Sequence, residues 1–438
     1  MSFKTYIFYS LILFSVSTSA QRILTPEEAV ELTLEHNYGI KITNNTVEVA
    51  ENNASILNSG YLPTLTGAAG ANYNLDNTEA QFSNGETTTL NGAESSRYDA
   101  SVTLNYLLFD GLGRQYNYQR LKEEFNLSQL EARETIENVV LQLFAVYYSL
   151  ANISENKASL EQTINISKDR LLRSQYQFEY GQNTKLDVLN AEVDINNDSI
   201  NLINTKQNLI NTKRDLNVII GNKIASDFEV ETDIDFLLQL DKEDLLEKTK
   251  ANNISLLQAN KNIELSKIDI KSSKSQYLPS LGLNGSYGWN KNNNNAASFV
   301  SQSTNSGISG GLNLSWNLFD GGSTITQVKN SKIILENQEL QKEQLILDIE
   351  RNFYNAWDNY QNKLAIYRVQ EDNIRTAENN FERTEEKFKL GQTTSIEFRQ
   401  AQLNLRNAEL SRNQAKFDAK LAELDVLQIS GELLNIEL

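Results

Sequence analysis

The feature that most constrains the fold of this chain is an internal duplication of its sequence. Three motifs recur in the same order: Tyr-Leu-Pro at 61–63 and 277–279, Leu-Phe-Asp-Gly at 108–111 and 318–321, and Phe-x-x-Gly-Gln at 178–182 and 388–392. The last two pairs share an offset of 210 residues (318 − 108 and 388 − 178), and the first pair is offset by 216 (277 − 61). This period is far too long for a solenoid and predicts a duplicated domain.

We expect a signal segment at 1–20, a first structural repeat at 21–227 and a second at 228–438. Lys4 precedes a short apolar stretch, Tyr6 to Val16, and small residues follow, which is the pattern of a secretory signal. The stretch is shorter than the ~20 apolar residues that a spanning helix needs. No comparable apolar run follows, but the strands of a membrane barrel give only a weak alternating signal.

Each repeat is expected to open with a helix that runs about 35 residues, from a capping signal to the Tyr-Leu-Pro motif. Thr25 is a good N-cap and Pro26 suits the first helical position, and Asp241 opens the second repeat in the same style. The proline of the motif then favours a change from helix to strand.

Four runs after these prolines alternate between apolar and small polar residues, at 65–75, 98–108, 281–290 and 308–318. They predict one strand pair within about 64–109 and another within about 280–319, each strand having the length of a tilted membrane strand. Aromatic residues gather on the apolar faces, and Asp99 is the only charge on the opposite faces. The polar segments at about 77–97 and 291–306 are expected to be exposed loops.

A half-buried sheet in a soluble sandwich would alternate in the same way. That alternative fits poorly, because only four such strands occur in a chain that is otherwise helical. Four strands cannot close a barrel, and open strand edges are not tolerated in lipid. Two chains would give eight strands with a filled interior, whereas three give twelve strands and a lumen. The pattern therefore predicts a homotrimer in contact with membrane lipid.

Composition excludes several classes of function. The formal net charge of −17 argues against nucleic acid as a partner. The absence of cysteine excludes disulfides, thiolate metal sites and a lipidated cysteine, and a single histidine, His36, makes an imidazole metal cluster or a catalytic triad hard to build. With no Gly-rich phosphate loop or nucleophile elbow, we expect no enzyme, no cofactor and no metal, and we interpret His36 as a solvated helix residue.

Long helical hairpins are expected at about 113–220 and 323–430. Proline is rare, with three in the chain, and the long arms at 113–180 and 323–390 contain no proline and no interior glycine. In the second arm, apolar residues step by threes, fours and sevens, which is typical of a coiled-coil seam: Ile346, Ile349, Phe353, Trp357, Tyr360, Leu364, Tyr367, Ile374, Ala377, Phe381 and Phe388.

Each hairpin tip combines a helix-ending glycine with a restart. Thr184 and Thr394 are each followed three residues later by an acid, Asp187 and Glu397, which fits a capping box. The alternative is that these acids, repeated in three chains, place six carboxylates around a narrow end and bind cations there. The two roles do not exclude each other.

Taken together, these motifs resemble the TolC family of outer-membrane efflux channels over essentially the whole chain after residue 20. The resemblance implies a trimer with a twelve-stranded barrel in the outer membrane of a Gram-negative cell. It also implies a helical barrel across the periplasm and a mixed region between the two, here involving residues 222–240. It further implies a periplasmic iris that opens when an adaptor (membrane fusion) protein and an inner-membrane pump dock.

The chain departs from this family at the constriction, which usually carries two acids spaced Asp-x-x-Asp in the second hairpin. Here the corresponding positions are Glu397 and Gln400, and the first hairpin has Asp187 and Asn190. These four residues are the candidate pore constriction, with one acid in each hairpin instead of a double aspartate ring.

We therefore predict a passive export duct of a tripartite efflux or type I secretion system, which conducts small molecules or proteins. The alternative is a periplasmic coiled-coil adaptor or stalk protein without a pore. Such a protein would lack the four alternating strands and would not repeat them at the same point in each half.

Overall fold

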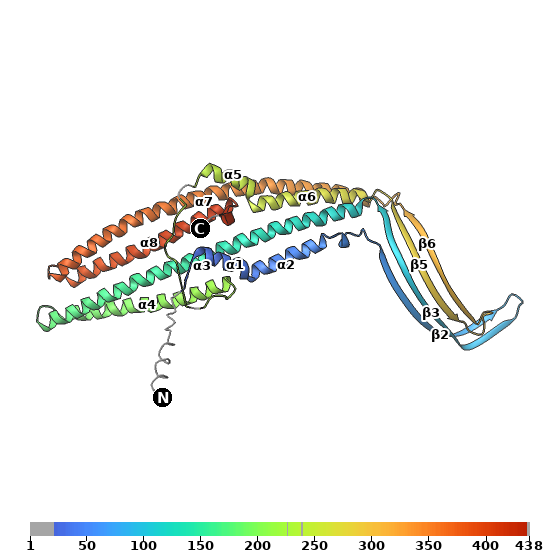
Figure 1. Ribbon diagram of the computed structural model, residues 1–438, viewed down its shortest axis with the longest axis horizontal. Helices are drawn as coiled ribbons and strands as arrows, with labels where there is room; N and C mark the ends of the chain where they lie inside the picture. Colours follow the sequence, from blue (N-terminus) through green and yellow to red (C-terminus); the bar gives the residue numbers. More distant parts are fainter. Residues whose placement is uncertain (1–21, 226, 238–239, 436–438) are drawn as a thin grey trace, which may run out of the picture. The chain divides into compact units, whose positions relative to one another are not determined.

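Both halves of the chain follow the same succession of elements in the computed structural model (Figure 1), which describes residues 22–225, 227–237 and 240–435. In chain order the elements are β1 (Arg22–Leu24), α1 (Pro26–His36), α2 (Tyr38–Asn53), η1 (Ile56–Asn58), β2 (Thr64–Gln81), β3 (Thr87–Asp110), α3 (Gly113–Glu179), α4 (Lys185–Ile219), β4 (Phe228–Val230), α5 (Lys242–Asn252), α6 (Ile254–Ser275), β5 (Ser280–Asn293), β6 (Gln302–Ser315), α7 (Ser323–Lys389), α8 (Ser395–Ile429) and η2 (Leu433–Asn435). The expected signal segment at 1–20 lies outside the described residues.

The chain divides into two compact units, and each unit takes segments from both halves. A helical unit consists of residues up to 44, 132–254 and 345 onward, and a sheet unit consists of residues 45–131 and 255–344. The compact units therefore cut across the two expected repeats, so the repeats stay a prediction about the sequence.

The sheet unit contains one antiparallel sheet with the strand order β2-β3-β5-β6. Its register brings Gly67, Val102, Tyr287 and Ile308 into one row and the neighbouring residues Thr66, Thr103, Ser286 and Ser309 into the next. Because successive side chains point to opposite faces, one face carries the apolar rows and the other carries the small polar rows. A mainly helical chain with four long antiparallel strands confirms the predicted fold class.

The apolar face of the sheet is exposed and has the height of a membrane. Ile308 is 86% and Tyr287 is 54% exposed. Aromatic residues lie toward both ends of this face, with Tyr98 near one end and Phe109 near the other. From Tyr98 to Phe109 the strand rises roughly 36 Å at ~3.3 Å per residue, which is about 28 Å along the normal of a membrane for a ~40° tilt.

One expected loop is mostly strand. The segment 77–97 continues β2 and β3 as a long hairpin that closes at residues 82–86, where the Phe82 amide donates to the Glu86 carbonyl at 2.8 Å. Both faces of this extension are polar, so it lacks the alternation of apolar and polar residues that marks a half-buried strand. The sequence therefore contained no indication that the backbone of this segment pairs as a strand. At the other end, β6 stops at Ser315 although the alternating run reaches 318, because Ser315 pairs with Ser280 and Pro279 cannot continue the ladder.

The Leu-Phe-Asp-Gly motifs form the turns from sheet to long helix. The Asp110 carboxylate accepts from the Arg114 amide at 2.7 Å, and Asp320 accepts from the Thr324 amide at 2.8 Å. Gly111 has a φ of +68° and packs so closely on the Ser275 carbonyl that a Cβ would collide with it. Only glycine fits both the left-handed backbone and the contact.

The core of the helical unit lies where β1, β4 and the four long helices meet. Its largest fully buried side chains include Phe144, Tyr147 and Tyr148 of α3, Phe353 of α7 and Phe417 of α8. The Tyr147 hydroxyl donates to the Leu24 carbonyl at 2.6 Å and accepts from the Glu231 amide at 3.2 Å, which fastens both short strands to α3.

The predicted seam along α7 is confirmed at its buried members: Ile349, Phe353, Tyr360, Phe381 and Phe388. In α3, one 18-residue window has a mean hydropathy of 1.2, enough by length and composition for a membrane span. Buried α3 residues such as Leu143 and Leu150 belong to the core of the helical unit, so this window is accounted for by packing within the protein.

The opening helices are broken where single helices were expected. Asn37 separates α1 from α2, and Asn253 separates α5 from α6. The Asn37 side chain donates to the Ile219 carbonyl at 2.8 Å, and the Asn253 side chain donates to the Ile429 carbonyl at 2.9 Å. Each break therefore satisfies a carbonyl at the end of α4 or α8, a tertiary contact that local helix signals do not encode.

Candidate functional site: the hairpin tips

Both hairpin tips use the same turn. Gly181 and Gly391 have φ values of +71° and +74°. The Gln182 amide donates to the Gln177 carbonyl at 2.7 Å, and the Gln392 amide donates to the Lys387 carbonyl at 2.8 Å. This is the arrangement in which a glycine ends a helix and satisfies its last carbonyls.

The predicted capping boxes are present at the start of α4 and α8. Asp187 accepts from the Thr184 amide at 3.3 Å and from the Thr184 hydroxyl at 2.8 Å. Glu397 accepts from the Thr393 hydroxyl at 2.6 Å and from the Thr394 amide at 2.9 Å. Both acids therefore accept hydrogen bonds that stabilise the turn at the start of the helix.

The Glu397 carboxylate is strongly favoured over its protonated form. The hydrogen bond from the Thr393 hydroxyl, together with those from the Thr394 amide and hydroxyl, lowers the pKa of Glu397 to about 2. Its side chain is exposed, so these donors act without the opposing effect of deep burial. Glu397 keeps its charge over the whole physiological range of pH.

Asn190 and Gln400 lie one turn further along the same helices. Both are exposed in the single chain, and Gln400 donates to the Asn404 side chain at 2.9 Å. The structure thus places all four predicted constriction residues within the first two turns of α4 and α8. Whether they line a pore depends on neighbouring chains, so their role as a constriction stays a prediction.

A buried ionic cluster, which was not predicted from the sequence, links the two hairpins. Asp198 of α4 is fully buried and binds Arg399 of α8 through two hydrogen bonds, at 2.7 and 2.9 Å. Ser167 of α3 donates to Asp198 at 2.8 Å, and Arg406 lies 3.4 Å from it. Burial opposes ionisation, but the bonds from Arg399 and Ser167 outweigh it and hold the pKa of Asp198 below its usual value.

The cluster belongs to a polar seam between α3 and α8. Toward the tips, the facing side chains pair through hydrogen bonds: Asn152 with Gln414, Asn156 with Asn413, Ser159 with Glu409, and Ser167 with Gln402. On α3 these residues, with Thr163, whose carbonyl accepts from Gln402 at 2.9 Å, step by fours and threes (152, 156, 159, 163, 167), so they share one helix face. The same two helices meet through apolar residues near Phe144 and Phe417.

A signal for this seam was present in the sequence. Arg399 and Arg406 are seven residues apart and alternate with Gln402 and Glu409 on one face of α8. Polar residues at helical spacing are normally interpreted as a solvated surface, because charged side chains are almost never fully buried unless they are paired. The partners lie more than 200 residues away in sequence, so only the fold reveals the pairing.

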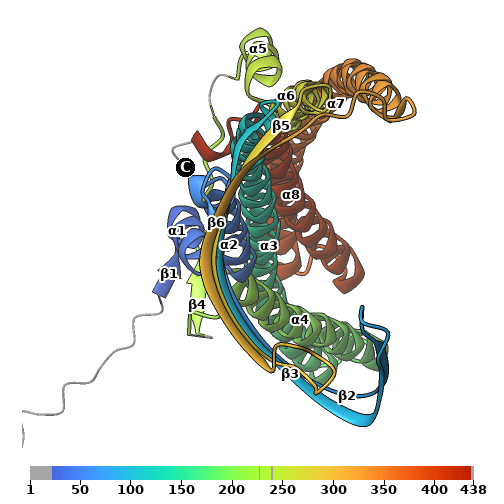
Figure 2. The same ribbon diagram turned by 90° about the vertical axis from the view of Figure 1, so that its right-hand side faces the viewer.

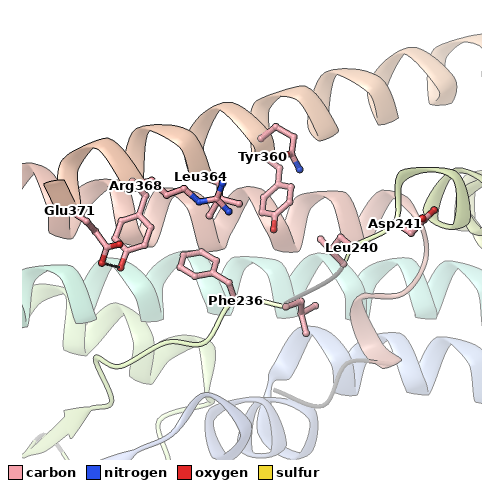
Figure 3. Close-up of a pocket in the computed structure, with 10 residues that line it drawn as sticks. Phe236, Leu240, Asp241, Tyr360, Leu364, Arg368 and Glu371 are labelled. Atoms are coloured by element: carbon pink, nitrogen blue, oxygen red, sulfur yellow. Dashed lines mark hydrogen bonds between the residues drawn. The ribbon is translucent and has the colours of Figure 1, made fainter.

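The helical unit also contains a cavity of about 650 Å³ between α7 and the segment that precedes α5 (Figure 3). Phe236 and Tyr367 face each other there with ring centroids 5.5 Å apart, and Tyr367 donates to Glu371 at 2.9 Å. Burial raises the pKa of Tyr360 and of Tyr367 to about 12, so both stay neutral phenols. Beside Phe236, the Asp235 carbonyl accepts a hydrogen bond from Lys420 at 2.8 Å.

Among the residues that the structure describes, no group of three His, Asp or Glu side chains is arranged to hold a metal ion. The tips offer capped carboxylates and exposed amides.

Comparison with known proteins places these features in one family. A family model described as outer membrane efflux protein matches residues 29–222 and 245–432. The outer membrane efflux protein BepC of Brucella suis is 20% identical over 387 residues, which are 88% of this chain and 81% of that protein.

Solved structures share the fold at low sequence identity. The CmeC outer membrane channel of Campylobacter jejuni aligns with a TM-score of 0.75 and 16% identity, covering 93% of this chain and 86% of that one. A membrane protein from Pseudomonas aeruginosa aligns with a TM-score of 0.74 and 16% identity, covering 93% and 90% of the two chains.

Proposed function

We propose that three copies of this chain, which belongs to the outer membrane efflux protein family, form one continuous duct. The chain is a non-enzymatic channel component of an efflux system. It lies in the outer membrane and spans into the periplasm. The observation that carries this proposal is the sheet β2-β3-β5-β6, which has an exposed apolar face and whose outer strands, β2 and β6, each have one edge without a partner strand in the described chain. In lipid both edges need partners. Pairing β6 of one copy with β2 of the next supports a closed barrel of twelve strands.

A second feature supports assembly of the helical part. α4 carries an exposed apolar stripe with helical spacing: Leu186, Leu189, Val193, Ile200, Ile203 and Ile210. A stripe of this length on a water-soluble helix needs a partner, and α3 already covers the opposite face of α4. A neighbouring copy of the chain supplies that partner in a ring.

We further propose that Asp187, Asn190, Glu397 and Gln400 of three copies surround the periplasmic end of the duct. Their support is the position of all four at the two tips, with Asn190 and Gln400 exposed and unshielded by the single chain. One acid per tip gives six carboxylates in the ring, fixed by their capping bonds.

In this proposal the duct conducts its cargo passively. A periplasmic adaptor protein and an inner-membrane pump supply energy and choose the cargo, which is a small molecule or a protein. The rival reading as a pore-free adaptor or stalk is set aside, because the chain belongs to the channel family and carries the four strands.

The decisive experiment is to purify the protein from outer membranes, measure its oligomeric mass and record currents in planar bilayers. We expect a trimer that migrates differently before and after heating and that forms stable pores. A monomer that leaves bilayers silent would remove the duct proposal.

The ring of acids has its own test in the same bilayers. Asp187→Asn and Glu397→Gln are expected to weaken block by divalent cations or to shift ion selectivity, because they remove fixed charge at the narrow end. Unchanged currents would leave both acids as helix caps only.

A further inference from the structure

The predicted constriction residues Asn190 and Gln400 each begin a line of exposed, uncharged polar side chains. We name these two lines the amide tracks. On α4 the track consists of Asn190, Asn197, Asn201, Asn204, Asn208 and Asn211, all exposed. On α8 it consists of Gln400, Asn404, Asn407, Ser411 and Gln414, also exposed. The steps of three, four and seven residues keep each track on one face of its helix.

The two tracks lie on the same side of α3. Asn201, Asn204 and Asn208 line a groove of about 440 Å³ together with Arg406 and Leu410 of α8. A different groove, on the other side of the α3–α4 pair, is lined by Ala158 of α3 and by Glu229, Val230 and Thr232 of the segment that includes β4. In Figure 2, β1 and β4 lie to the left of α3, and α8 lies to its right.

This division identifies the inner wall of the proposed duct. Three copies of the segment around β4 would obstruct a lumen, so the side of α3 that carries it must face outward. The opposite side, with the amide tracks, then faces the lumen. The proposed place of Asn190 and Gln400 at the constriction is consistent with this assignment.

Three charged residues beside the tracks have partners of opposite charge. Asp194, which continues the α4 track by spacing, pairs with Arg170. Arg406 pairs with Asp198 at 3.4 Å, and Asp418, next along the α8 track, pairs with Lys363 at 2.7 Å. Along the tracks the wall therefore presents hydrogen-bond donors and acceptors, and most of its charges are paired, although the whole chain carries −17.

We propose that the helical part of the duct has an amide-lined wall that discriminates by size and hydrogen bonding and not by charge. This inference rests on the proposed function as a trimeric duct. It assigns the cargo to polar or amphipathic molecules of either sign, including organic anions, which a wall of free carboxylates would repel. Any charge selectivity is then confined to the acids at the tips.

Because the chain contains no cysteine, the orientation of the tracks can be tested with single introduced thiols. Asn204→Cys lies on the α4 track, and Asn165→Cys is its matched control, exposed and seven residues from Ala158 on the outward side. Small N-ethylmaleimide is expected to label both in the purified trimer. A polyethylene-glycol maleimide too bulky to enter the duct is expected to label Asn165→Cys at least about tenfold faster. Equal rates for the bulky reagent would overturn the assignment.

The second measurement is the charge selectivity of the pores, which is determined from reversal potentials in a KCl gradient. The double variant Asn204→Asp/Asn208→Asp is expected to raise the permeability of K⁺ relative to Cl⁻ at least about threefold over the wild type, because it adds six carboxylates to the lumen. Asn165→Asp is expected to leave the ratio unchanged. Pores that conduct normally but ignore the double variant would refute the track inference alone, whereas a trimer without conductance would refute the duct itself.

Discussion

At the scale of the residue, four glycines with positive φ divide into two kinds. Gly181 and Gly391 sit at the tips, and nothing lies within 4 Å of the position that their Cβ would take. Gly221 and Gly431 end α4 and α8, where a Cβ would lie 2.5 Å from the His36 carbonyl and 2.6 Å from the Asn252 carbonyl. The first kind is required by the turn alone, and the second also by close packing against the broken opening helices.

This difference predicts unequal costs for alanine. Gly181→Ala is expected to lower the free energy of unfolding by about 1–2 kcal/mol, the cost of a left-handed residue with a side chain. Gly221→Ala and Gly431→Ala are expected to cost more than about 3 kcal/mol, since the backbone must also move. Thermal unfolding followed by circular dichroism measures both, and equal losses at all three positions would show that the contacts with His36 and Asn252 are unimportant.

The charge state of Glu397 predicts a pH dependence. A carboxyl whose folded pKa is depressed stabilises the folded state above its unfolded pKa and loses this contribution as pH falls through its folded value. For Glu397 this window runs from about 4.5 down to about 2. The melting temperature of the wild type should exceed that of Glu397→Gln at pH 5 to 7, and the difference should vanish near pH 2. A difference that persists unchanged at the lowest pH would contradict the capping role.

At the scale of the element, α3 and α8 meet through two kinds of surface. Near Phe144 and Phe417 the contact is apolar, and toward the tips it is a ladder of side-chain hydrogen bonds around Asp198. Parting an apolar contact exposes hydrocarbon to water, whereas parting hydrogen-bonded groups exchanges them for water at a net cost of ~1 kcal/mol each. The tip ends of the hairpins are joined by this ladder and by a smaller apolar cluster of Phe381, Phe388, Phe398 and Ala401, against which Ile166 of α3 packs.

Removing Arg399 isolates the contribution of that buried pair. Arg399→Ala is expected to cost about 3–5 kcal/mol, because it leaves the Asp198 carboxylate buried without its main partner. Arg399→Ala combined with Asp198→Asn should recover most of the loss. The exposed pair of Lys389 with Glu385 is the control, and Lys389→Ala should cost less than about 1 kcal/mol. Denaturant unfolding measures all three, and a cost for Arg399→Ala as small as the control would exclude a structural role for the cluster.

At the scale of the whole molecule, the faces of α4 are expected to have different roles. Ile203 belongs to the exposed apolar stripe and is 65% exposed, while its neighbour Asn204 belongs to an amide track. The stripe should meet the next copy of the chain and the track should meet water. Ile203 and Asn204, which are adjacent in the sequence, therefore provide a matched pair of positions for testing trimer assembly.

Ile203→Glu is expected to prevent or weaken trimer formation, because it places a charge in an apolar interface without a partner. Asn204→Glu should leave the oligomer intact. Native mass spectrometry of the detergent-solubilised protein reports both states. Trimers that survive Ile203→Glu and dissociate with Asn204→Glu would reverse the assignment of the two faces.

Much of this protein follows from its sequence alone. The prolines that precede strands, the alternation in four runs and the capping boxes at Thr184 and Thr394 are local signals. They allowed the long hairpins and their tips to be predicted with nearly correct limits, and the strands in part. The polar extension of β2 and β3 escaped prediction because neither of its faces is apolar. The constriction residues were found at the tips, but their local signal describes a cap equally well.

Only the tertiary structure decided which polar residues are buried and which are exposed. Asp198 and Asn204 both lie on α4 in a run rich in asparagine, and sequence gives no reason to separate them. One is enclosed by Arg399 and Ser167, and the other lies open on an amide track. The spacing of hydrophobic residues identifies the apolar face of a helix, because the hydrophobic effect favours burial of that face in any fold. The role of a polar face depends instead on the partner that the tertiary structure places beside it.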